Sequence, residues 1–449
     1  MDLGGNAGEE KAVFLWLFQI RYAIMTRDYE RKELLTMAVF QAAELLVPHR
    51  ELLNNWAVIA CDQFTSQPEY WRAVREQAGE EPSAYHIIFP EAELGSDEDA
   101  RIKSINAAMR RYLNGNVFDV FPASYIYVER TLLDGTVRRG VVGVIDLEEY
   151  DYRSDAASAV RATEQTVVER IPPRVRIRSG ACMEASHVML LTDDAEGRVL
   201  NSLEAKKASL PMLYDFDLMQ GGGHIAGRLV QDADAAVLDD ALKQYEASTR
   251  ERFVETGRAP LLYAVGDGNH SLATAKTCWE ALKAARPELA GTRHPARFAM
   301  AELQNIRDAS QKFEPIHRLL TEVSPDMLLH EAEPLCKPGG LTVDWCAGER
   351  RGTLSLDPAR GELPVAILQP FLDRYLKEHG GKIDYIHGDD TAARLAQREN
   401  ALAFLLPKIS KEAFFRGIVM DGVLPRKTFS MGHAQEKRYY LECRRITEE

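Results

Sequence analysis

The order of apolar and polar positions predicts a chain of short strands and amphipathic helices. The run Leu261–Val265 is apolar, short and followed by glycine, which predicts a buried strand. Apolar side chains then recur at helical spacing and predict a helix with one buried face: Leu272, Ala275, Trp279 and Leu282. The five residues between these elements, 266–270, therefore form a tight turn from a strand into a helix.

The same reasoning places the other elements. Helices are predicted at 66–79 with Ser66 as a cap, 97–114, 232–255, 325–333, 370–378 and 391–406. Alternation of period two around Asp134-Gly135 predicts a β-hairpin, residues 186–205 repeat that pattern with a longer turn, and strands are expected at 224–230 and 297–306. The pattern indicates a mixed α/β (α+β) fold, with mixed or antiparallel sheets and β-hairpins surrounded by helices.

A length of 449 residues suggests roughly two or three domains. We expect a sheet-rich half at 37–220 and an α/β half at 221–449 that carries the turn. Because Met37 opens an ordinary apolar segment, residues 1–36 are interpreted as an N-terminal extension or a misplaced start. The apolar run at 12–18 is too short to span a bilayer, and the acidic residues before it do not suit a signal peptide.

Charge and cysteine usage narrow the class of protein. Acidic residues outnumber basic ones by 68 to 55, and a net charge of −13 argues against nucleic acid or an anionic membrane as the main partner. A small molecule is therefore the expected partner, and the oligomeric state stays open. The six cysteines include no C-x-x-C pair, which fits a reducing cytoplasm. Four arginines are expected along a solvated strand edge: Arg170, Arg174, Arg176 and Arg178.

The turn at 266–270 carries the clearest chemistry. Gly266 and Gly268 permit positive φ angles and close backbone approach, so amides at the helix start can bind a phosphate or carboxylate. Asp267 would repel that anion, so we expect it to bind Mg²⁺, to orient His270, or to act as a base. The alternative is that Asp267 and Asn269 only cap the helix.

The turn and four further segments, which follow one another along the chain, resemble a known family. The turn is similar to the "DGHHR" turn of the uncharacterised bacterial and archaeal domain-of-unknown-function family ten-fifteen. "VRATEQTV" from Val160 resembles its Arg-x-Thr-Glu segment, "FEPIHRLL" from Phe313 its His-Arg segment, and "GVLPRKTFSM" from Gly422 its Pro-x-Lys-Ser/Thr segment. "WAVIACDQF" stands where the family has an apolar strand ending in Tyr-Asp. The likeness extends from about Met37 onward and implies no particular reaction.

A more distant resemblance does suggest a reaction. A turn of this type is also similar to that of ParB/sulfiredoxin-like proteins, including free serine kinases, in which the region faces nucleotide phosphates. This likeness implies a ParB/sulfiredoxin-like core and a nucleotide, ATP or ADP, with Mg²⁺. The chain departs from the pattern at Asn269 and Ser271, which stand in place of His and Arg, so one bidentate phosphate donor is missing.

Other polar residues are candidates with an ordinary alternative beside each. Arg161 and Glu164 offer a fork donor and a carboxylate, although on a helix they would form a surface ion pair. Glu302 and Asn305 end an apolar strand, where ligand contacts and capping are equally expected.

Asp62, His317 and Arg318 complete the set of candidates. Asp62 follows a strand and is either a general base or a helix cap, and His317 with Arg318 either grips an anion or packs in the core. His387 and Asp389 could ligate a metal, but a glycine turn with acidic caps is the better explanation.

The leading hypothesis is phosphoryl transfer from a nucleotide to a small hydroxylated acceptor such as an amino acid. In it the turn amides and His270 hold phosphate, Asp267 positions Mg²⁺, Arg161 or Arg318 neutralises charge, and Glu164 or Asp62 takes the hydroxyl proton. The binding candidates are Gly266, Gly268, Asn269, Arg161, His317, Arg318, Glu302 and Asn305. The alternatives are a non-catalytic nucleotide or metabolite sensor and a metal-assisted hydrolase built on the His387 and Asp389 region.

Overall fold

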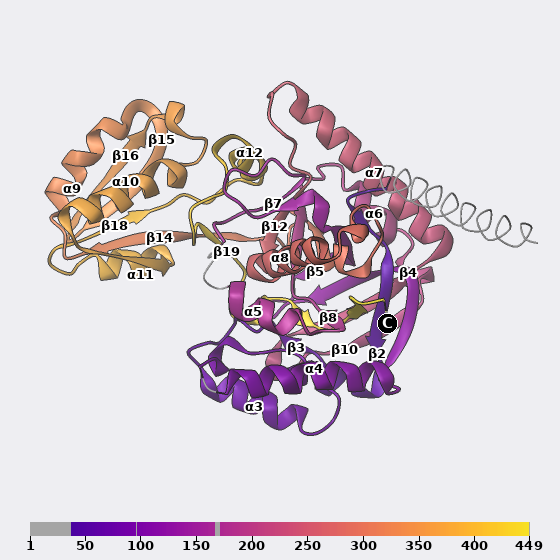
Figure 1. Ribbon diagram of the computed structural model, residues 1–449. Coiled ribbons are helices and arrows are strands. Elements are labelled where there is room, and N and C mark those ends of the chain that lie inside the picture. The colour runs from indigo at the N-terminus through magenta and orange to yellow at the C-terminus, as the bar shows by residue number, and fades with distance from the viewer. Residues whose placement is uncertain (1–36, 96, 167–170, 449) are drawn as a thin grey trace, which may run out of the picture.

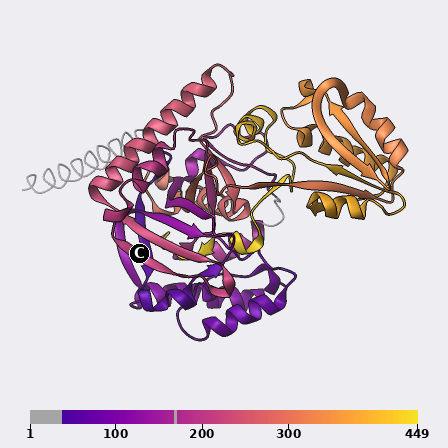
Figure 2. The ribbon, with the colours of Figure 1, turned by 180° about the vertical axis from the view of Figure 1, so that it is seen from behind.

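The structure is a computed structural model, and it describes residues 37–95, 97–166 and 171–448 (Figure 1). The predicted extension at 1–36 lies outside these residues. Two lobes are visible from both sides, a larger one built on a long sheet and a smaller one, orange to yellow, at its flank (Figures 1 and 2). In the described residues, no helix combines the length and the apolar character needed to cross a membrane.

The sheet of the larger lobe is mixed, with parallel and antiparallel pairs. Its strands are, in spatial order, β6 (Tyr150–Asp151), β7 (Val160–Ala162), β12 (Tyr263–Asp267), β9 (Met189–Thr192), β13 (Phe298–Asn305), β5 (Val137–Asp146), β4 (Phe118–Thr131), β2 (Ala43–Pro48), β21 (Cys443–Arg445) and β8 (Met183–Ala185). Three further strands extend it: β1 (Phe40–Gln41) on β5, and the hairpin of β10 (Met212–Asp217) and β11 (His224–Val230) on β4. A separate pair joins β3 (Val58–Ile59) to β20 (Tyr439–Tyr440).

Helices cover both faces of this sheet. The first face packs on α2 (Leu53–Trp56), α3 (Pro68–Ala78) and α4 (Glu98–Asn114), and the opposite face on α6 (Arg198–Glu204), α7 (Asp232–Val254) and α8 (Asn269–Ala285). Alternation along one strand divides the two cores, since Ile126 and Val128 lie in the first while Tyr125 and Tyr127 lie in the second. Helix α5 (Ile171–Arg178) packs against α8.

The smaller lobe is a second sheet with its own core. Its spatial order is β16 (Arg350–Leu356), β15 (Cys336–Ala347), β18 (Ala401–Leu405), β14 (Phe313–Thr321) and β17 (Lys382–His387), with β19 (Phe429–Met431) on β14. Its helices are α9 (Pro325–Ala332), α10 (Pro364–His379), α11 (Asp389–Leu395) and α12 (Lys411–Asp421). After β19 the chain returns to the larger lobe, so β20 and β21 bring the C-terminal segment beside β2, β3 and β8.

The mixed α/β class and the Asp134-Gly135 hairpin are confirmed, and several local predictions are wrong. Residues 186–205 contain strand β9 followed by helix α6, not a hairpin. The arginines of 174–178 lie on helix α5, not on a strand edge, and Arg170 is outside the described residues. The predicted helix at 391–406 ends at Leu395 and is followed by strand β18. The cap of α3 is Gln67 rather than Ser66, and the β10–β11 hairpin crosses the predicted boundary at 220/221.

A buried carboxyl on α7 gives the larger lobe a pH-dependent stability. Glu246 Oε1 accepts hydrogen bonds from the Val39 backbone N–H at 2.7 Å and from the Tyr263 hydroxyl at 2.8 Å. Burial raises the pKa of Glu246 to about 7, because desolvation of the carboxylate outweighs both hydrogen bonds. Between pH 4.5 and about pH 7, the folded state therefore keeps a proton on Glu246 that the unfolded chain has lost. The contribution of Glu246 to stability is fully present below the unfolded pKa and is lost as the pH rises through the folded pKa.

We expect the stability to fall as the pH rises from about 4.5 to about 7, by roughly 3 kcal/mol from this group alone. Glu246→Gln keeps an oxygen for both hydrogen bonds and has no proton to lose, so the variant should lack that part of the decline. Urea unfolding of both proteins at pH 5 and pH 8 measures it. A stability difference between variant and wild type that is the same at both pH values would contradict the assignment.

Candidate functional site

The strand–turn–helix predicted around Asp267 is present. Strand β12 ends at Asp267, Gly268 is the N-cap with φ of 80°, and α8 begins at Asn269. A Cβ on Gly268 would lie 2.9 Å from Val188 Cα, so both the backbone angle and the packing require glycine there. Gly266 was expected to permit a positive φ as well, and this is wrong. It lies inside the strand, and its lack of a side chain admits Met431, whose Sδ would be 2.9 Å from a Cβ.

The polar atoms of the turn are only partly used by the protein. Asp267 Oδ1 accepts the Gly268 N–H at 2.9 Å, and Asp267 Oδ2 lies 3.4 Å from Lys437 Nζ. Asp267 Oδ2 and Asn269 Oδ1 are buried and have no hydrogen-bond partner among the described residues. Since Gly268 is the cap, helix capping does not explain Asn269. His270 lies in the first turn, where its carbonyl accepts the Thr274 hydroxyl.

The charge of Lys437 also acts on a second carboxylate, that of Asp62. Asp62 follows β3, and Gln63 Nε2 donates to its Oδ1 at 3.0 Å. Burial raises the pKa of Asp62, but the charge of His187, the Gln63 hydrogen bond and the charge of Lys437 outweigh it and bring the pKa below its ordinary value. Asp62 is therefore ionised at neutral pH, with the charges of His187 and Lys437 acting on it. Neither Lys437 nor His187 was predicted from the sequence.

Buried arginines hold the backbone on which Lys437 lies. Arg130 Nη2 donates to the Gln435 carbonyl at 2.6 Å and Arg130 Nη1 to the Lys437 carbonyl, while Arg138 Nη1 donates to the Glu436 carbonyl at 2.7 Å. Burial and the charge of Arg138 lower the pKa of Arg130 to about 9. These guanidinium groups occupy carbonyls of three successive residues, which fixes the direction of the segment.

Glu302 supports the next residue of that segment. Its Oε2 accepts Arg438 Nε at 2.9 Å, and Arg438 Nη2 donates to Glu442 Oε2 at 2.6 Å, with all three side chains buried. Burial raises the pKa of Glu302, but Arg438 and Arg138 more than compensate and lower it. Met189 pairs with Glu302 on one side and Asp267 on the other, so the two carboxylates lie at one level of the sheet.

Glu164 and Arg318 meet at a loop of the C-terminal segment. Glu164 accepts the backbone N–H groups of Lys427 at 3.1 Å and Thr428 at 3.0 Å, one on each carboxylate oxygen. Arg318, wholly buried, donates to the Lys427 carbonyl at 2.8 Å and to Gln369 Oε1 at 2.8 Å. Burial raises the pKa of Glu164 and lowers that of Arg318 to about 10. These two residues bind the protein's own backbone.

Three other candidates lie in backbone contacts of the same kind. Arg161 donates to the Ser158 carbonyl at 2.9 Å and the Ala259 carbonyl at 2.7 Å. Asn305 Nδ2 donates to the Asp194 carbonyl at 2.7 Å. The third candidate is His317. Its Nδ1 accepts the Leu406 N–H at 3.1 Å, and its Nε2 is 2.7 Å from Asp389 Oδ1.

His387 and Asp389, the alternative metal ligands of the sequence analysis, do not gather a third ligand in the described part of the chain. Within that part, the group of His, Cys, Asp or Glu side chains close enough to share an ion is Glu331, Glu378 and His379, on α9 and α10 of the smaller lobe. Two of these three side chains are exposed. Neither group is adjacent in sequence to the turn.

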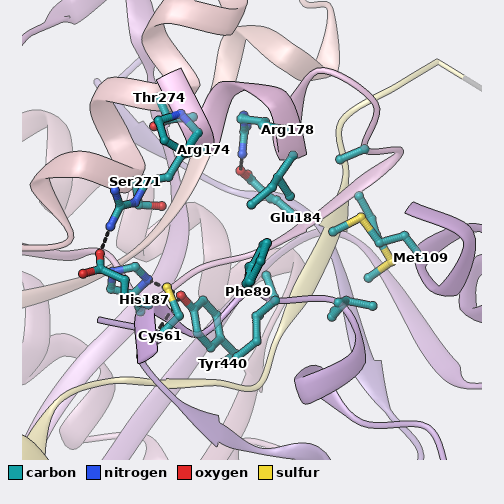
Figure 3. Close-up of a pocket in the computed structure, with 18 of the residues that line it drawn as sticks. Cys61, Phe89, Met109, Arg174, Arg178, Glu184, His187, Ser271, Thr274 and Tyr440 are labelled. Carbon is teal, nitrogen blue, oxygen red and sulfur yellow. Dashed lines mark hydrogen bonds and ion pairs between the residues drawn. The ribbon is translucent and has the colours of Figure 1, made fainter. Parts of the chain in front are cut away.

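An apolar cavity of about 330 Å³ opens beside the turn (Figure 3). Ser271 and Thr274 of α8 line it, together with Arg174 of α5 and Cys61, the neighbour of Asp62. His187 Nδ1 and the Tyr440 hydroxyl, 2.7 Å apart, form another part of the wall. The cavity therefore adjoins both aspartate-bearing segments.

The fold and the site thus define a mixed α/β protein whose polar centre lies at a strand–turn–helix. The family model described as "Protein of unknown function (DUF1015)" matches residues 43–445, and the chain belongs to this family. No match is found among the curated proteins.

Weak matches occur among solved structures. Free serine kinase in complex with AMP gives a TM-score of 0.35 at 10% identity, covering 68% of this chain and 91% of that chain. SbnI with a C-terminal truncation from Staphylococcus aureus gives 0.33 at 10% identity, covering 65% and 83%. A conserved hypothetical protein from Pyrococcus furiosus gives 0.33 at 11% identity, covering 66% and 93%.

Substitution of Gly268 tests the geometry of the turn. Gly268→Ala should lower the free energy of unfolding by about 3 kcal/mol, since it adds both left-handed strain and a contact with Val188. Gly291→Ala is the matched control, because Gly291 has a similar φ of 78° and no atom within 4 Å of a Cβ. It should lose only about 1 kcal/mol. Equal losses in urea unfolding would show that the Val188 contact is not tight.

Proposed function

We propose that the protein binds a nucleotide with Mg²⁺ at the turn and transfers a phosphoryl group to the hydroxyl of a small metabolite such as an amino acid. One observation carries this proposal: at the N-terminus of α8, Asp267 lies 3.4 Å from Lys437, whose charge also acts on Asp62. The first N–H groups of a helix have no carbonyl acceptor within it, and the helix dipole favours an anion there. The positive charge of Lys437 attracts a phosphate, and the negative charges of the carboxylates attract a cation.

The donor set of the turn fits Mg²⁺. Asp267 Oδ2 and Asn269 Oδ1 are buried oxygens without a hydrogen-bond partner in the described chain, and hard cations take oxygen ligands. Mg²⁺ is commonly held by one or two carboxylates together with substrate phosphates, so a preformed group of three acidic ligands is not required. When bound, the ion neutralises charge on the phosphate oxygens.

The protein's own groups then have separate tasks. The α8 amides and His270 hold phosphate, and Lys437 neutralises its charge. The acceptor hydroxyl oxygen forms a bond to the terminal phosphorus as the bond from that phosphorus to the bridging oxygen of the nucleotide breaks. This releases ADP from ATP or AMP from ADP, and the hydroxyl proton passes to a carboxylate. Asp62 suits this last task better than Glu164, because both oxygens of Glu164 accept backbone N–H groups.

Nucleotide binding and transfer can be measured separately. Mg²⁺ with ATP or ADP should raise the melting temperature of the wild type, and Asp267→Ala and Lys437→Met should abolish most of that shift. Asp62→Asn should keep the shift and slow acceptor-dependent ADP release by about 10²- to 10⁴-fold, as expected for loss of a general base.

Asp240→Asn, an exposed carboxylate on α7, is the control and should behave as wild type. A nucleotide shift that survives in both Asp267→Ala and Lys437→Met would place the phosphate elsewhere. Nucleotide binding without release of the product nucleotide, ADP from ATP or AMP from ADP, in the presence of hydroxylated acceptors would favour a sensor over an enzyme.

A further inference from the structure

We infer that the apolar cavity beside α8 binds the purine base of the nucleotide, an assignment that rests on the proposed function. Three features of the wall carry it: its position next to the turn, its apolar composition, and one buried donor.

The cavity continues directly from the polar centre. Ser271, in the first turn of α8, and His187, whose charge lowers the pKa of Asp62, both line it. Figure 3 shows His187 and Ser271 on one side of the cavity and Met109 on the opposite side. A ligand whose phosphates lie at the α8 N-terminus can therefore extend its other end toward Met109.

The wall at that far end is mainly apolar. Its apolar side chains include Ile87, Ile88, Phe89, Met109, Ile177 and Met183. A phosphate or carboxylate among them would lose its hydration, and the guanidinium group of Arg178 in the same wall is already paired with Glu184. An apolar ring gains from the same burial, and Phe89 supplies an aromatic ring in the wall for it to contact.

A donor in this wall distinguishes a heteroaromatic ring from an aliphatic chain. Arg178 Nη1 donates to Glu184 Oε2 at 2.5 Å, whereas Arg178 Nη2 is buried without a hydrogen-bond partner in the residues that the structure describes. Glu184 is itself fixed by the Met300 N–H and Arg444, so Arg178 cannot swing away without breaking a buried ion pair. An alkyl group would leave this N–H unsatisfied, while a ring nitrogen can accept it.

The size of the cavity favours a purine. About 330 Å³ lies at the lower end of the range of roughly 300–1,000 Å³ for small-molecule sites. Two fused rings fill such a space better than a single ring does, and they also offer several acceptor nitrogens to Arg178. Arg174 lies on α5 at the same wall as Thr274 and borders the path between base and phosphates.

The test compares Mg²⁺ complexes of ATP, CTP and inorganic tripolyphosphate by calorimetry on the full chain. Wild type should bind ATP more tightly than CTP or tripolyphosphate. Phe89→Ala should weaken ATP binding about tenfold and leave tripolyphosphate binding unchanged. Phe121→Ala is the matched control, since Phe121 packs on the same core but does not line the cavity, and it should change neither.

Arg178→Lys provides a second variant if Phe89→Ala does not fold. It keeps a positive charge for Glu184 and loses the planar second N–H₂, so the preference for ATP over CTP should shrink. The assignment is overturned if ATP and tripolyphosphate bind wild type equally, or if Phe89→Ala leaves ATP affinity intact; in both cases the phosphate site of the proposed function stands. Failure of every phosphate compound to bind wild type overturns both proposals.

Discussion

The buried ion pairs of Arg438 are the constraint on which the site depends. A guanidinium group in a protein interior loses much of its hydration, and only well-placed acceptors offset that loss. Arg438 finds Glu302 on β13 of the central sheet, Glu442 four residues further on, and the Ser186 carbonyl. The final segment of the chain therefore has one register on the larger lobe. Lys437 precedes Arg438 directly, so that register also decides where the lysine charge meets Asp267.

Two of the family's motif segments serve to hold a third. Glu164, in the Arg-x-Thr-Glu segment, takes backbone N–H groups of residues 427 and 428, and Arg318, in the His-Arg segment, takes the carbonyl of residue 427. The side-chain atoms that form these hydrogen bonds with the backbone are not available to a ligand. The loop of residues 422–428 joins α12 to β19, and Met431 of β19 packs against Gly266 of β12. The three segments therefore fix how the returning chain approaches the turn.

Local patterns predicted what local forces determine. The Asp134-Gly135 hairpin and helix α7 follow from turn chemistry and periodicity within a few residues, and the turn at Asp267 follows in the same way. A helix was predicted at residues 401–405 because a short apolar run fits either a helix or a strand. Pairing with β14 and β15 makes this segment a strand. The acidic turn near Asp194 was read as a hairpin, but Asp194 Oδ2 accepts the Val199 N–H, and a helix begins there instead. Lys437 and His187 carry no local signal, because only the long-range pairing of β20 and β21 brings the C-terminal segment to the sheet.

The charges of the turn also bear on the apparent conflict of an aspartate at the proposed anion site. Asp267 alone would oppose the dipole of α8, which attracts negative charge. Lys437 Nζ lies 3.4 Å from Asp267 Oδ2, and Arg138 lies close enough for its charge to interact with that of Asp267, so basic side chains of the protein offset part of the negative charge at the turn. Because Asp267 Oδ2 makes only the 3.4 Å approach to Lys437, a cation that binds this oxygen would release the lysine toward a phosphate. Cation and anion binding at the turn would then favour one another, because the cation releases the Lys437 ammonium group from Asp267 and the anion attracts it.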